Sequence, residues 1–111
     1  MLIRPEQEFV YASAIFEERL PTLCVEIEDH LVAIQVLTRE ETIQHRPLIQ
    51  SLLRSGYGYG FRRFDSLAQF VSYWFLLGPG WDAAQPIAAI LRERISEEDK
   101  WSRIDALLPE E

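Results

Sequence analysis

The stretch from Asp65 to Leu77 constrains the fold more than any other part of the sequence. It reads Asp-Ser-Leu-Ala-Gln-Phe-Val-Ser-Tyr-Trp-Phe-Leu-Leu and is followed at once by Gly-Pro-Gly. Aspartate is a residue type that caps the beginning of a helix, and glycine and proline are typical of its end. Apolar side chains occupy almost every side of the expected helix, and such a helix is normally surrounded by others. We therefore expect residues 65–77 to form a central apolar helix, with Gln69 and Ser72 on its one polar strip.

The N-terminal third of the sequence also has helical periodicity. Apolar residues recur every three or four positions from Phe9 to Leu20, which predicts a first helix that ends near Pro21. Residues 22–37 carry a helical stripe together with many β-branched side chains, so a helix and a β-hairpin both stay open there. The helix is favoured, because a two-stranded hairpin without a third strand is marginal.

Caps and helix breakers divide the rest of the chain. Thr38-Arg39-Glu40-Glu41 has the pattern of a capping box, and Pro47 predicts a kink or restart of the helix near residues 45–47. The alternate glycines at 56, 58 and 60 are poor helix formers, and Gly60 is expected to take the left-handed position beyond the helix end, with Phe61 in apolar contact. Two short helices, capped by Asp82 and Ser96, are expected to follow.

These elements predict an all-α fold. We expect a single compact bundle of five or six short helices around the central helix, forming one domain over residues 1–111. The length agrees with the commonest domain size, and the apolar content of 48% is that of an ordinary globular protein.

The charge and the cysteine content limit the partners and the compartment. The net charge of −7 opposes binding to nucleic acid and favours a basic or amphipathic protein partner. No apolar run approaches the about 20 residues that cross a membrane. The N-terminus has no apolar export signal, and the single cysteine, Cys24, forms no internal disulfide. These features predict a cytoplasmic protein that binds neither nucleic acid nor membrane.

Catalytic and metal-binding patterns are missing from the sequence. Cys24, His30 and His45 are scattered, without the spacings of metal ligands or of a nucleophile and its base. The glycines at 56–60 follow no strand and precede no Gly-Lys-Ser/Thr, so they do not match a phosphate loop. We expect no metal, no cofactor and no enzymatic activity.

One basic spot lies among aromatic residues. Arg62 and Arg63 are flanked by Tyr57 and Tyr59, and Trp81 stands at the Gly-Pro-Gly corner, where we expect it to be partly exposed. We take these five residues as the candidate partner-binding site, because aromatic and arginine side chains dominate protein interfaces. The alternative, in which the arginines pack over aromatic rings or pair with Asp65, stays open.

Three motifs follow one another in the second half of the sequence: Tyr59-Gly60-Phe61, the segment from Phe75 to Asp82, and Pro86–Leu91. Through these motifs, residues 49–91 resemble a group of small, uncharacterised, all-helical bacterial proteins that are encoded near type VI secretion effectors. The chain departs from the pattern at Trp81, where phenylalanine is usual, and in its glycines at 56 and 58. The resemblance implies an all-helical fold and a partner encoded nearby, and it implies no active site.

The sequence therefore predicts a small cytoplasmic protein-interaction module. We expect an adaptor, a chaperone or an immunity-type partner of a secreted bacterial effector. The alternative is a structural protein that forms homo-oligomers, such as a homodimer, and has no enzymatic activity.

Overall fold

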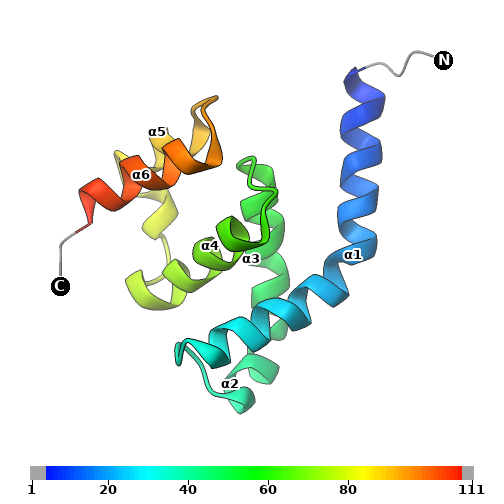
Figure 1. Ribbon diagram of the computed structural model, residues 1–111, viewed down its shortest axis with the longest axis vertical. Coiled ribbons are helices and arrows are strands. Elements are labelled where there is room, and N and C mark those ends of the chain that lie inside the picture. Colours follow the sequence, from blue (N-terminus) through cyan, green and yellow to red (C-terminus); the bar gives the residue numbers. More distant parts are fainter. Residues whose placement is uncertain (1–4, 109–111) are drawn as a thin grey trace. The chain divides into compact units, whose positions relative to one another are not determined.

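The computed structural model describes residues 5–108, with side chains from Ala14 onward. Within that range the regular elements are all helical (Figure 1): α1 (Pro5–Ala33), α2 (Arg39–Gln44), α3 (Arg46–Gly58), α4 (Phe64–Leu77), the 3-10 helix η1 (Trp81–Ala83), α5 (Ile87–Arg92) and α6 (Glu97–Leu107). The prediction of an all-α fold is confirmed. The chain divides into two units, Met1–Gln50 and Ser51–Glu111. A single domain over residues 1–111 stays a prediction.

In the first unit, α1 continues through Pro21, so the prediction of a helix end there is wrong. The hairpin proposed as an alternative for residues 22–37 is also excluded, because α1 runs to Ala33. Figure 1 shows α1 changing direction in its middle, as expected where a proline removes one backbone hydrogen bond and crowds the preceding turn. A buried stripe runs past the proline and holds the helix together on its inner side: Leu20, Cys24, Ile27 and Leu31.

The end of α1 has a geometry that the sequence does not signal. Gln35 takes the left-handed position with φ 63°, although glycine is usual there. The amide of Val36 donates to the carbonyl of Leu31 at 2.9 Å, and that of Gln35 donates to Val32 at 3.1 Å. These two bonds close a Schellman motif and satisfy carbonyls that the helix leaves free.

The predicted breaks after α1 are confirmed. The amide of Glu41 donates to the Thr38 hydroxyl at 3.2 Å, and the amide of Thr38 donates to the Glu41 carboxylate at 3.0 Å, which completes the capping box. The helix ends at Gln44 and restarts at Arg46. Pro47 therefore lies in the first turn of α3, where an N–H is not needed.

In the second unit, α3 ends in the predicted Schellman motif. Gly60 has φ 100°, and the amide of Phe61 donates to the carbonyl of Gly56 at 3.1 Å. The helix nevertheless includes Gly56 and Gly58, contrary to the expectation that the alternate glycines would stop it. A Cβ atom on Gly56 would lie only 3.0 Å from the side chain of Leu67, so the glycine allows α3 to approach α4 closely.

An aromatic cluster forms the core of the second unit. It contains Phe61, Phe70, Tyr73, Trp81 and Trp101, which come from the loop after α3, from α4, from η1 and from α6. The rings of Phe61 and Trp101 stack with centroids 4.9 Å apart, and Phe70 and Tyr73 each lie 5.4 Å from Trp81. The expectation that Trp81 is partly exposed is therefore wrong, since only 6% of the residue is accessible.

The helix α4 has almost the predicted bounds but a different pattern of burial. The proposed polar strip is wrong at Ser72, which is buried and donates its hydroxyl to the carbonyl of Ala68 at 2.7 Å. The apolar residues near the C-terminal end are not fully covered. Leu76 is 62% exposed and Leu77 is 44% exposed, so the expectation of a helix surrounded by others fails at its C-terminal end.

The beginning of α5 differs from the prediction, whereas the beginning of α6 agrees with it. Asp82 lies within η1 and does not cap a longer helix, because α5 begins only at Ile87. Ser96 caps α6 as expected, and its hydroxyl accepts from the amide of Asp99 at 3.1 Å. The helix α5 contacts both η1 and α6, and α4 contacts η1. No helix in the described range is both long and apolar enough to cross a membrane.

Replacing Gly60 with alanine is expected to destabilise the protein by about 1–2 kcal/mol, because a side chain disfavours its left-handed backbone. The matched control is Gly58→Ala. Gly58 is helical, and no neighbouring atom lies within 4 Å of the position that a Cβ atom would take, so alanine should be neutral or stabilise by about 0.5 kcal/mol. Urea unfolding of both variants measures the difference, and equal effects would contradict the left-handed role of Gly60 at the helix end.

Candidate functional site

The structure places Arg62 over Tyr57 instead of leaving both side chains free for a partner. The guanidinium carbon lies 3.6 Å from the centre of the Tyr57 ring. The same group donates to the carbonyls of Tyr57 at 2.7 Å and of Phe61 at 3.1 Å, so it holds carbonyl groups at the end of α3. The alternative left open by the sequence, arginine packed over an aromatic ring, is the arrangement observed for Arg62.

Arg63 lies at the surface between two carboxylates. Its guanidinium contacts Asp65 at 3.2 Å and Glu98 at 3.3 Å, and all three side chains are exposed. Exposed pairs of this kind contribute about 0–1 kcal/mol to stability. The backbone amides of Arg62 and Arg63 donate to the Glu97 carboxylate at 2.8 and 3.2 Å, which ties the beginning of α6 to this loop.

Tyr59 packs against the aromatic cluster, and Trp81 is part of it. The Tyr59 hydroxyl donates to Asp82 at 3.1 Å, and its ring lies 5.7 Å from that of Phe70. Burial, with the neighbouring Asp82 carboxylate, raises the pKa of Tyr59. The indole N–H groups of Trp81 and Trp101 are buried and have no acceptor among the residues that the structure describes. Of the five predicted residues, Tyr57, Tyr59 and Arg62 therefore have clear structural roles, and their part in partner binding stays a prediction.

The last turn of α4 presents an exposed apolar surface, which we call the α4 end. It consists of Trp74, Phe75, Leu76 and Leu77. Trp74 and Phe75 are half-buried and their rings contact each other edge to face, with centroids 5.0 Å apart. Leu76 and Leu77 extend further into solvent. The sequence pattern predicts a binding residue just beyond this helix end, at Trp81, and does not predict the exposed leucines.

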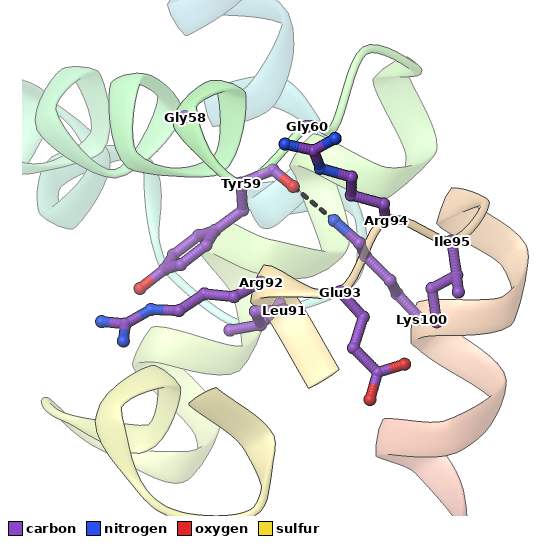
Figure 2. A pocket seen from close by; sticks show the side chains of 9 residues that line it. All are labelled: Gly58, Tyr59, Gly60, Leu91, Arg92, Glu93, Arg94, Ile95 and Lys100. Atoms are coloured by element: carbon purple, nitrogen blue, oxygen red, sulfur yellow. Dashed lines mark hydrogen bonds between the residues drawn. The ribbon is translucent and has the colours of Figure 1, made fainter. Parts of the chain in front are cut away.

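An open pocket of about 410 Å³ lies between the end of α3 and the segment that joins α5 to α6 (Figure 2). Three of its side chains are cationic, Arg92, Arg94 and Lys100, and one is acidic, Glu93. The remaining lining residues are small, apolar or aromatic: Gly58, Tyr59, Gly60, Leu91 and Ile95. The only signal in the sequence was that Lys100 is the single lysine, which by itself indicated no site.

The first unit contains a buried carboxylate, Glu28, with two polar partners. Glu28 is 1% exposed and accepts two hydrogen bonds from the Arg46 guanidinium, both at 2.9 Å, while the Cys24 thiol donates to it at 3.3 Å. The bond from Arg46 is the main reason why the pKa of Glu28 is lowered. Burial and the hydrogen bond to Glu28 raise the pKa of Cys24 to about 12. Cys24 therefore stays a protonated thiol at neutral pH and lacks the reactivity of a catalytic cysteine.

Comparison of the chain with known proteins assigns it to no family. No protein-family model, no curated protein and no solved structure matches the chain. Among the residues that the structure describes, no group of three or more histidine, cysteine, aspartate or glutamate side chains has the arrangement of a metal site. The function must therefore be inferred from the surfaces of the chain itself.

Removing Arg46 is expected to destabilise the protein by about 3 kcal/mol, because Arg46→Ala leaves the buried Glu28 carboxylate without its partner. Arg39→Ala is the matched control. Its pair with Asp29 at 2.7 Å is exposed on both sides, so the loss should be about 0.5 kcal/mol. Equal losses in urea unfolding at pH 7 would contradict the assignment.

The same pair gives a pH dependence with a defined sign. The pKa of Glu28 is lowered in the folded protein from its ordinary value of 4.5. The stability contributed by the pair is therefore present above pH 4.5 and is lost as the pH falls through the lowered pKa. Arg46→Ala should remove this part of the acid sensitivity.

Cys24 is expected to react slowly with thiol reagents in the native protein and quickly in denaturant. The pKa of Cys24 rises from 9.0 to about 12 on folding. Above pH 9 the thiol therefore loses its proton in the unfolded chain but keeps it in the folded protein. Stability should fall between pH 9 and pH 12, and Cys24→Ala should lose that component. Urea unfolding of the wild type and of Cys24→Ala at pH 8 and pH 10 measures this component. Both proteins contain the same tyrosines, so the effect of tyrosine ionisation cancels in the comparison. Rapid native labelling would contradict the buried thiol.

Proposed function

We propose that this protein is a binding module without enzymatic activity, and that the α4 end is the surface that binds another protein. The observation that carries the proposal is the exposure of Leu76 at 62%, directly beside Leu77 at 44%. Two adjacent exposed leucines next to two half-buried aromatic rings form an apolar surface that water does not favour.

The geometry of a helix end makes this surface accessible from several directions. Successive residues of an α-helix are rotated by about 100°, so four consecutive apolar residues surround most of the last turn. Full burial of one leucine side chain stabilises a complex by about 1.5–3 kcal/mol before the costs of association. The α4 end therefore suits a partner with a pocket or groove that encloses the helix end.

The charge of the chain favours a different protein over a second copy. Two copies would bring two net charges of −7 together, which opposes their association at low salt. A partner with a basic rim around an apolar groove would gain from the same charge. A homodimer that buries the α4 end is the alternative, and mass measurement in solution distinguishes the two.

The class of partner rests on the resemblance of residues 49–91. It suggests a role as an adaptor, a chaperone or an immunity-type partner of a secreted bacterial effector, in the cytoplasm of the cell that makes it. A cysteine nucleophile at Cys24 is disfavoured, because its pKa of about 12 keeps the thiol protonated.

The test is co-expression with the proteins encoded on either side of the gene, followed by size-exclusion chromatography with mass measurement and by calorimetry. We expect one of them to form a complex, and Leu76→Glu to weaken it by at least about 30-fold, the effect of losing about 2 kcal/mol at an interface hot spot.

Ile43→Glu is the control for this experiment. Ile43 is also an exposed apolar residue, but it lies on α2 in the first unit, so the same charge change should leave binding intact. If Leu76→Glu binds as tightly as the wild type, the α4 end is not the interface. If the wild type alone is a dimer and Leu76→Glu is a monomer, the surface serves self-association.

A further inference from the structure

Lys100 is a buried cation that the protein itself neutralises poorly. Only 5% of the residue is exposed. Its ammonium group carries three N–H donors, and it donates to one acceptor in the described residues, the main-chain carbonyl of Tyr59 (Figure 2). Its nitrogen also lies 5.5 Å from the centre of the Phe61 ring, a weak attraction. A buried charge without a paired carboxylate is unfavourable, and burial accordingly lowers the pKa of Lys100.

The other cations of the pocket have no carboxylate partner either. Among the side chains that the structure describes, those of residues 14–108, neither Arg92 nor Arg94 forms an ion pair with a carboxylate. Figure 2 shows Arg92 extending alongside the Tyr59 ring and Arg94 reaching toward Gly60. The two guanidinium groups therefore point in different directions, that of Arg92 toward the hydroxyl end of the Tyr59 ring and that of Arg94 toward the end of α3.

The nearby carboxylates are held by other groups. Glu93, the one acidic residue in the lining, accepts from Arg103 at 2.6 Å. Glu97 lies close enough to raise the pKa of Lys100, but its carboxylate accepts from the backbone amides of Arg62 and Arg63. The lining of the pocket thus carries three cations and one carboxylate, on a chain whose net charge is −7.

We infer that this pocket binds a small ligand that carries phosphate or carboxylate groups. Guanidinium groups match the geometry of both oxyanions, and the two unused N–H donors of Lys100 supply further charge-assisted bonds. The half-buried side chains of Tyr59 and Ile95 provide an apolar wall for the rest of the ligand. The volume of about 410 Å³ falls within the range of small-molecule sites. The inference goes beyond the proposed function, because the pocket shares no residue with the α4 end.

The test uses the full chain with two probes, pyrophosphate and citrate, each titrated at constant ionic strength against sodium chloride. Binding is measured by calorimetry and by the shift of the thermal unfolding midpoint. We expect at least one probe to bind and to raise the midpoint, and the stronger probe identifies phosphate or carboxylate as the preferred group. Arg92→Gln and Arg94→Gln should each weaken binding by about tenfold or more, as expected for the loss of a charge-assisted hydrogen bond.

Arg19→Gln is the matched control, because Arg19 is an exposed arginine of α1 in the other unit and its replacement changes the net charge equally. Both pocket arginines are exposed, so their variants should fold, which circular dichroism verifies. Leu76→Glu should bind the probe normally, which separates this site from the proposed protein interface. The inference is overturned if neither probe binds beyond the effect of chloride, or if Arg19→Gln loses as much affinity as Arg92→Gln and Arg94→Gln.

Discussion

The packing of the aromatic cluster is the interaction on which the second unit depends. Phe61, Phe70, Tyr73, Trp81 and Trp101 come from four separate segments, and large rings of this kind bury about 150–250 Å² each. Two glycines make the packing possible. Gly60 turns the chain through a left-handed conformation so that Phe61 enters the core, and Gly56 leaves room for Leu67 and Phe70 beside α3. The cluster therefore requires both backbone features and aromatic side chains at fixed positions.

The same packing determines which polar groups lie at the edge of the core. Tyr73 donates to Asp105 at 2.6 Å, and burial together with this bond raises its pKa to about 12. Trp101 stacks on Phe61, and Lys100, the residue before it in α6, is directed to the carbonyl of Tyr59. The buried ammonium group of the pocket is thus a consequence of how α6 docks through Trp101. The register of α6 therefore places Trp101 in the aromatic core and, at the same time, Lys100 in the pocket, where no carboxylate of the described residues pairs with its charge.

The two candidate surfaces of this unit differ in their chemistry. The α4 end is apolar and exposed, and it suits a protein that encloses the end of a helix. The pocket between α3 and α5–α6 is lined by cations and suits a small anion. Because the two surfaces share no residue, each can be occupied without the other. Three of the eleven basic residues of this acidic chain line that one pocket.

Local signals in the sequence determined the helical class, the bounds of α4, the capping box at Thr38 and the left-handed Gly60, because each depends on residues within one or two turns. Tertiary structure decided the rest. Pro21 bends α1 without ending it, and buried side chains lie directly before it at Leu20 and after it at Cys24, Ile27 and Leu31. The buried Glu28 carboxylate is paired with Arg46, which lies 18 residues further along the chain. Trp81 is covered by three rings from two other segments, α4 and α6, while the apolar Leu76 is left exposed. Hydrophobicity states what a side chain gains from burial, but only the docking of distant elements decides which side chains obtain it.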